Sequence, residues 1–222
     1  MTTPPELARY LESFRDTWED HADPASVRFV VMDCETTGLD SRKDRLVSIG
    51  AVSLVGSEIV LDDSFEALLK IDYNLSAVTV HGITRDQARD GMDEDHALLS
   101  FLDYLGDGVI VGHHIGHDIA TMNVALDRYF GEQLHNRWLD TMDLTLLLQR
   151  SGAFDGLGPL KAFSLDAVCD FFNVTPHDRH TATGDALLTA LVFLKLLRVG
   201  RRFGRGDLVS LCERVPPDEP QE

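Results

Sequence analysis

The first part of the chain holds three apolar runs separated by short polar links. The runs cover residues 28–35, 45–55 and 58–71, and the second link contains Gly56. Short links favour strands that lie antiparallel to their neighbours in the sequence. The pattern therefore predicts three strands that pair in chain order.

In the remainder of the chain, the spacing of apolar residues changes from that of strands to that of helices. Apolar residues recur at helical spacing and predict helices over 84–91, 93–106, 117–130, 142–150, 164–172 and 183–198. Two short apolar runs, 108–114 and 137–141, predict further strands. Ser164 and Thr183 are the expected N-caps of the last two helices. An α/β fold follows, with one mixed sheet of about five strands, the first three antiparallel, flanked by helices.

The first 26 residues predict a helical extension that precedes the main domain. Apolar side chains recur there at helical spacing, at Leu7, Tyr10, Leu11, Phe14 and Trp18. This amphipathic helix is expected to pack on the domain or on a partner. We expect the main domain over 27–200 and a C-terminal tail over 201–222, whose Pro-rich and acidic end is disordered.

Charge and composition narrow the classes of protein. The formal net charge of −17 argues against a protein that coats nucleic acid by bulk attraction. No apolar stretch approaches the roughly 20 residues that cross a bilayer, so no membrane association is expected. The N-terminus lacks the pattern of a signal peptide. Cys34, Cys169 and Cys212 lie far apart, which indicates a reduced, cytoplasmic protein rather than a disulfide framework.

Two acids end the first apolar run. Side chains on a strand alternate between its faces, so Asp33 and Glu35 point to one side and Cys34 to the other. Two carboxylates about 7 Å apart along a strand repel each other unless a cation lies between them. Mg²⁺ and Mn²⁺ take oxygen ligands of this kind. The pair alone leaves a second interpretation open, a polar strand end that faces water.

Two further acids and a histidine extend this group of candidates. Asp118 and Asp185 each lie in the first turn of a predicted helix, and His180 precedes Asp185 by five residues. By itself, either acid is explained as a charge that the N-terminus of a helix favours. A histidine in a loop is most often solvated, so the role of these three residues depends on the wider pattern.

That wider pattern resembles a known enzyme family. Between residues 28 and 197 the chain resembles the DEDDh exonucleases through motifs that occur in the order of that family: "VVMDCETTGLD", "VHGIT", "VGHHIGHDIATMN", "WLDTMDL", "SLDAVCDFF" and "HTATGDALLTALVF". The family includes the proofreading epsilon subunit of bacterial DNA polymerase III. The resemblance implies an RNase H-like fold and a 3′–5′ exonuclease activity that releases nucleoside 5′-monophosphates.

The resemblance also implies roles for single residues. It implies a cage of acids around two divalent ions, Mg²⁺ or Mn²⁺, made by Asp33, Glu35, Asp118 and Asp185. It implies His180 as the general base that takes the proton of the attacking water. Contacts to the terminal nucleotide are implied for Thr36, Thr37, Leu39, His81, Ile83, His114 and His117.

Two of those substrate positions depart from the family. Where its members usually carry Asn and Phe before the third acid, this chain carries His114 and His117. His117 can still stack on a base and His114 can still donate a hydrogen bond. We therefore expect altered contacts to the terminal nucleotide rather than lost activity. A zinc site that uses His114 and His117 is an alternative interpretation.

The substrate expected from these residues is a single-stranded or frayed DNA 3′ end, because unpaired bases can enter a narrow site. An exonuclease acting on RNA or short oligonucleotides would carry the same acids, and a non-catalytic binding module is an alternative of another class. A DNA polymerase subunit is a candidate partner. The chain has two small basic groups that could approach a nucleic acid, one at Arg42, Lys43 and Arg45 and the other at Arg198, Arg201, Arg202 and Arg205.

Overall fold

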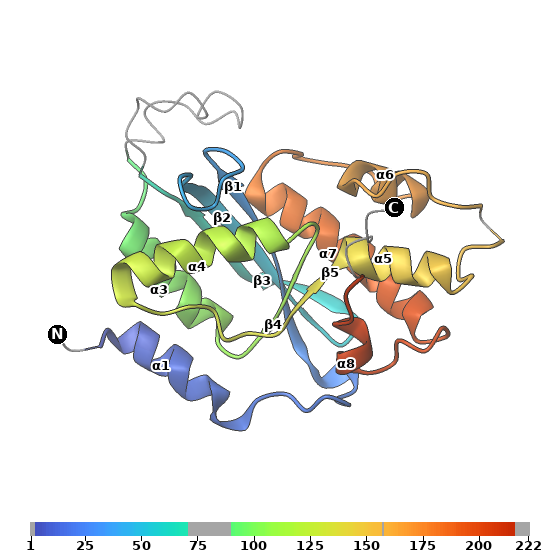
Figure 1. Cartoon of the computed structure of the whole chain (residues 1–222), viewed down its shortest axis with the longest axis horizontal. Coiled ribbons are helices and arrows are strands. Elements are labelled where there is room, and N and C mark those ends of the chain that lie inside the picture. The colour runs from blue at the N-terminus through green and yellow to red at the C-terminus, as the bar shows by residue number, and fades with distance from the viewer. Residues whose placement is uncertain (1–2, 71–89, 157, 216–222) are drawn as a thin grey trace, which may run out of the picture.

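A computed structural model describes residues 3–70, 90–156 and 158–215. Its centre is a five-stranded sheet in the order β3-β2-β1-β4-β5 (Figure 1). The strands are β1 (Arg28–Thr36), β2 (Leu46–Val55), β3 (Glu58–Leu68), β4 (Val109–Gly112) and β5 (Trp138–Asp140). β2 pairs antiparallel with β1 and β3, whereas β4 lies parallel to β1 and β5. The predicted α/β fold with a mixed sheet is confirmed.

Helices cover both faces of this sheet. They are α1 (Pro5–Ser13), α3 (Glu94–Leu105), α4 (Gly116–Phe130), α5 (Thr141–Arg150), α6 (Leu165–Phe171), α7 (Ala182–Gly200) and α8 (Leu208–Leu211). The helices predicted from residue 93 onward are therefore confirmed as α3 to α7, whereas most of the predicted helix over 84–91 lies outside the described residues. Within the described chain, every helix is too short or too polar to cross a membrane.

The alternation of side chains along β1 separates two core clusters. Phe29 belongs to the cluster under α5, α6 and α7, and Met32 to the cluster under α1, α3 and α4 (Figure 1). Asp33 and Glu35 lie an even number of residues after Phe29 on β1, so their side chains point to the same face of the strand as Phe29 does. They continue that face beyond its apolar part. Cys34 joins the opposite core, as the strand alternation predicts.

The N-terminal helix packs on the rest of the chain. α1 lies against α3, and its Tyr10 hydroxyl donates to Asn136 Oδ1 at 2.6 Å and accepts from the backbone N–H of His135 at 2.8 Å. Its apolar face is thus buried on the domain, one of the two placements expected. The helix is shorter than its spacing predicts. It ends at Ser13, whose hydroxyl donates to the Tyr10 carbonyl, and a 3₁₀ turn, η1 (Phe14–Asp16), leads on to Trp18.

One of the two predicted helix caps is wrong. The N-cap of α7 is Thr181, whose hydroxyl accepts from the N–H of Gly184 at 3.1 Å, and Thr183 lies inside the first turn. The preceding loop folds so tightly against the helix that a Cβ at Gly184 would lie 2.1 Å from the carbonyl oxygen of Asp178. The helix therefore begins earlier than its apolar pattern indicates. The cap Ser164 is confirmed, since its hydroxyl accepts from the backbone N–H three residues on.

A glycine in β2 determines how closely α7 approaches the sheet. Gly50 is the direct partner of Asp33 across the β1–β2 ladder. A Cβ at Gly50 would lie 2.3 Å from backbone atoms of both Ala182 and Thr183. Only a residue without a side chain lets the start of α7 lie this close to β2. The contact brings Asp185, in the first turn of α7, beside the end of β1.

Candidate active site

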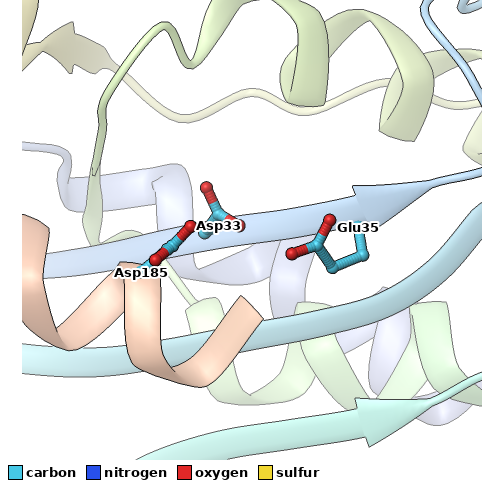
Figure 2. A group of neighbouring side chains, drawn as sticks. All are labelled: Asp33, Glu35 and Asp185. Carbon is cyan, nitrogen blue, oxygen red and sulfur yellow. The ribbon is translucent and has the colours of Figure 1, made fainter. Parts of the chain in front are cut away.

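Three carboxylates meet where the end of β1 passes the N-terminus of α7 (Figure 2). Asp33 and Glu35 come from β1 and Asp185 from α7, and one oxygen of each lies within 4.8 Å of the others. In the described parts of the chain, this is the only group of three or more His, Cys or acidic side chains close enough to share a metal ion. Asp185 is 8% exposed. Repulsion among these carboxylates is therefore weakly screened by water.

Asp118 approaches the same place from another element. It lies in the first turn of α4 and is 7% exposed. Its Oδ1 accepts a hydrogen bond from the backbone N–H of Cys34 at 3.0 Å, so this carboxylate is anchored to β1 between Asp33 and Glu35. The four predicted acids therefore converge on one end of the sheet, three as an oxygen cluster and Asp118 beside them.

Burial and neighbouring charges favour the protonated form of two of these acids, Asp33 and Asp118. Burial raises the pKa of Asp33 well above its usual range, and the charges of Asp118, Asp185 and Glu35 raise it further. Burial also raises the pKa of Asp118 to about 7, against the effect of its backbone hydrogen bonds. A bound cation would stabilise this site, because it would offset the repulsion among the carboxylates.

One cation of the chain itself already contacts the cluster. The guanidinium of Arg179 is ion-paired with Asp185, and it also holds Asp166 of α6 through Nε at 2.6 Å and Nη2 at 3.2 Å. Asp185 Oδ1 is buried and accepts no hydrogen bond of ordinary geometry. Among the described residues, its charge is therefore compensated by the ion pair with Arg179.

His180 lies on the turn that immediately precedes α7. Its side chain is exposed, and its backbone has a left-handed φ of 63°. For a residue other than glycine, this conformation costs about 1–2 kcal/mol. The turn is held by the hydroxyl of Thr181, which donates to the carbonyl of Asp178 at 2.7 Å. The imidazole therefore stands next to Arg179 at the surface, where water and a substrate can reach it.

The last residue of β1 and the loop that follows it carry three of the predicted substrate contacts. Thr36 Oγ1 donates to a loop carbonyl at 2.7 Å and lies 3.5 Å from Nε2 of His117. Thr37 donates its hydroxyl proton to Asp44 at 2.8 Å, so its side chain holds the loop together. Leu39 is 90% exposed at the tip. An apolar side chain so exposed is available to contact a base.

The basic residues of this loop are mostly engaged in ion pairs. Lys43 lies 2.9 Å from Asp40, and Arg45 lies 3.0 Å from Glu94 at the start of α3. Arg42 is exposed and forms no ion pair with any described residue. Two of the three cations therefore fix the loop, and Arg42 is the one available for a phosphate.

The remaining predicted contacts fall into two groups. His117 is half-buried and faces the loop after β1. His114 is exposed, with a left-handed φ of 58°, and its backbone N–H donates to Asp140 at 3.0 Å. The described structure does not bring these two imidazoles together as ligands, so nothing in it supports the alternative zinc site. His81 and Ile83 lie outside the described residues.

The donor set of the cluster fits hard divalent cations. Asp33, Glu35 and Asp185 offer oxygen atoms alone, and no thiol or imidazole belongs to the group. Mg²⁺ and Mn²⁺ prefer such ligands. A metal ion bound there would add to the single positive charge that Arg179 already places beside Asp185.

Two residues of this site, Arg179 and Gly50, are not predicted by the sequence pattern. Arg179 was not singled out, because an arginine in a polar loop is usually solvated. Gly50 was not singled out either, because a glycine within a strand gives no sign of what packs on it. The one available signal for Arg179 was its place directly before His180.

Comparisons with known proteins agree with this geometry. Residues 30–193 match the model of the RNase_T family, which is described as an exonuclease. The DNA polymerase III epsilon subunit of Aquifex aeolicus is 31% identical over 186 residues, which cover 82% of this chain and 87% of that protein. The PolC-type DNA polymerase III of Thermotoga maritima is 31% identical over 178 residues, covering 79% of this chain. The chain spans only 12% of that PolC-type relative.

A solved structure has the same fold. Escherichia coli Exonuclease I, in a complex with a dT13 oligonucleotide, superposes with a TM-score of 0.66 at 20% sequence identity. The match covers 80% of this chain and 42% of that chain. The expected exonuclease fold of the RNase H-like type is thereby confirmed.

Proposed function

This chain belongs to the RNase_T family of exonucleases, and we propose that it is a metal-dependent 3′–5′ exonuclease. It hydrolyses phosphodiester bonds at DNA 3′ ends and releases nucleoside 5′-monophosphates. The observation that carries the proposal is the oxygen cluster of Asp33, Glu35 and Asp185, with Asp118 anchored beside it. A buried acidic cluster repels a phosphodiester by itself, so this chemistry requires bound cations.

Two divalent ions, Mg²⁺ or Mn²⁺, would be held by these four carboxylates. When bound, such ions activate the attacking water and offset the charge that develops on the leaving 3′ oxygen. The contribution of the protein is to hold the four carboxylates in fixed positions. Asp33 and Glu35 are fixed by the β1 ladder, Asp185 by the contact of α7 with Gly50, and Asp118 by the N–H of Cys34.

We propose His180 as the general base. Its imidazole takes the proton from the attacking water, a role that requires the neutral form and access to solvent. The side chain is exposed and lies on a turn with a left-handed backbone, which supports an imidazole held for function rather than for packing.

The substrate proposed is a single-stranded or frayed DNA 3′ end. The exposed Leu39 at the rim supports this, because it can contact an unpaired terminal base. His117 beside Thr36 offers a flat ring for stacking, and His114 offers a hydrogen-bond donor. E. coli Exonuclease I, which shares the fold, was solved in a complex with a dT13 oligonucleotide.

A DNA polymerase subunit is the partner that we propose, since the named relatives are a polymerase subunit and PolC-type polymerases. α1 does not offer its apolar face for this contact, because Tyr10 and its neighbours are buried against α3.

We retain 27–200 as the proposed catalytic domain, preceded by the extension and followed by the tail. A reduced, cytoplasmic setting stays a prediction, and the three cysteines are free.

The substrate assignment is tested with paired oligonucleotides. Matched single-stranded DNA and RNA, each labelled at the 5′ end, are incubated with Mg²⁺ or Mn²⁺. A ladder that shortens from the 3′ end of DNA supports the proposal. Cleavage of RNA alone would replace DNA as the substrate, and intact strands under all four conditions would favour a non-catalytic binding module.

A further inference from the structure

A cavity lies at the end of α7 opposite to the acidic cluster. It has a volume of about 530 Å³ and lies between the C-terminal turn of α7, the residues that follow it, the short helix η2 (Pro24–Ser26) and the β2–β3 turn at Gly56. Four of its lining residues are arginines, namely Arg198, Arg201, Arg202 and Arg205. We refer to this site as the arginine pocket.

The arginine pocket is separate from the acidic cluster. Asp185 lies in the first turn of α7 and Arg198 in its last turn. A helix rises about 1.5 Å per residue, so the 13 residue steps from Asp185 to Arg198 span roughly 20 Å. A ligand in the pocket therefore does not touch the proposed catalytic residues.

Only part of the positive charge in the pocket is neutralised. Arg201 lies 3.5 Å from Asp23, and Arg205 is ion-paired with Glu213 and donates to the carbonyl of Ser210 at 2.8 Å. Arg198 and Arg202 are exposed and form no ion pair with any residue that the structure describes. In a chain of net charge −17, two such unpaired arginines lining one cavity require an explanation.

Structural roles explain only part of this group of cations. A basic residue in the last turn of a helix favours the helix dipole, which accounts for Arg198. Arg201, Arg202 and Arg205 lie beyond the end of α7, where the last carbonyls already accept backbone N–H groups. Arg201 and Arg205 are held by their ion pairs with Asp23 and Glu213. Arg202 is therefore the cation that neither the dipole nor an ion pair among the described residues explains.

The walls of the pocket define the chemistry of its ligand. Leu194 and Leu197 supply an apolar surface beside the guanidinium groups. Guanidinium groups bind phosphate through planar pairs of N–H donors, and they suit it better than an ammonium group does. The volume lies within the range of about 300–1,000 Å³ that is usual for small-molecule sites. A phosphate joined to a flat, partly apolar ring matches both features.

We propose that the arginine pocket binds a nucleotide, with its phosphate on Arg198 and Arg202 and its base against Leu194 and Leu197. The nucleotide has two possible sources: a free nucleoside 5′-monophosphate, or one unit of a longer strand. That either is present at this protein rests on the proposed function, but binding at the pocket does not depend on hydrolysis.

The test uses the full chain in EDTA, so that no divalent ion is present and no cleavage occurs. Binding of dAMP is measured by calorimetry, and binding of a fluorescent dT oligonucleotide by polarisation. The double variant Arg198→Glu with Arg202→Glu is compared with the wild type. Arg150→Glu is the matched control, because Arg150 is an exposed arginine on α5 without an ion pair among described residues.

We expect the double variant to weaken binding at least tenfold while Arg150→Glu leaves it unchanged. Binding of dAMP identifies the free monophosphate as a ligand, and binding of the oligonucleotide alone identifies a strand. The milder pair Arg198→Gln with Arg202→Gln should give a smaller loss in the same direction, and melting curves establish that each variant is folded.

The proposal is overturned if neither probe binds, or if the double variant binds as well as the wild type. Capture of a glutamate-rich peptide in place of both nucleotides would also overturn it, because the pocket would then serve an acidic protein segment. Because the assay contains no divalent ion, its outcome is independent of whether the acidic cluster hydrolyses DNA.

Discussion

The guanidinium of Arg179 is ion-paired with Asp185, a proposed metal ligand. The same guanidinium holds Asp166 on α6, so it joins the acidic cluster to the helix that packs beside it. The side chains of Arg179 and Asp185 are only 20% and 12% exposed. The chain therefore supplies one positive charge of its own to a site whose acids otherwise repel one another.

Arg179→Ala should destabilise the metal-free protein by about 1–3 kcal/mol, because it leaves a buried carboxylate without its partner. Mn²⁺ should then stabilise the variant more than it stabilises the wild type, since it replaces the lost cation. Denaturant melts in EDTA and in Mn²⁺ measure both effects. Arg150→Ala is the control, and equal stability of Arg179→Ala and wild type in EDTA would show that the ion pair is unimportant.

Gly50→Ala should lower turnover by about 10²-fold or more, because its Cβ would meet the backbone of Ala182 and Thr183 and push Asp185 away from Asp33. The variant should also lose stability through overpacking. Steady-state kinetics and melting curves measure the two losses. Gly156→Ala serves as the control, since a Cβ there meets nothing within 4 Å. Wild-type kinetics in Gly50→Ala would mean that α7 is not positioned by this contact.

The free energy of unfolding should depend on pH because Asp118 is buried. Burial raises the pKa of Asp118 to about 7 from its ordinary value of 3.8, so the folded state keeps a proton that the unfolded chain releases. This contribution to stability is full below pH 4 and is lost as the pH rises through 7. Between these limits in EDTA, the free energy of unfolding of Asp118→Asn should fall less steeply with pH than that of the wild type. Parallel pH profiles would contradict the raised pKa.

His180→Ala should slow turnover by roughly 10² or more if His180 is the general base. Because the side chain is exposed, the substitution should leave the melting temperature unchanged. Steady-state kinetics at saturating Mn²⁺ and melting curves measure the two effects. Near-normal turnover of the variant would remove His180 from the mechanism.

Much of the fold was predictable because its signals are local. The apolar period along β1 predicts a strand whose alternate residues face two cores, and Phe29 and Met32 lie as that period requires. The same alternation places Asp33 and Glu35 on one side and Cys34 on the other. The helix caps were less certain, since Thr181 and Thr183 are equally suitable residues and only the fold of the preceding loop selects between them.

The residues of the site were predictable only where they belong to a recognisable motif. Asp118 and Asp185 lie at helix N-termini, where an acid has an ordinary explanation, and the order of motifs was needed to connect them with Asp33. The ion pair of Arg179 and the contact of Gly50 depend on how α6 and α7 pack on the sheet. Neither leaves a periodic or compositional trace, and the position of Arg179 directly before His180 was the one local signal.

The central claim is that the acids of β1 and α7 form a metal-dependent site that cuts DNA from its 3′ end. The most direct measurement is the release of labelled nucleoside 5′-monophosphate from single-stranded DNA labelled in its last nucleotide. Wild type and Asp33→Asn are compared in Mn²⁺ and in EDTA. We predict release by the wild type in Mn²⁺ alone and none by Asp33→Asn, which should remain folded because the substitution relieves repulsion. Release in EDTA, or undiminished release by a folded Asp33→Asn, would contradict the claim.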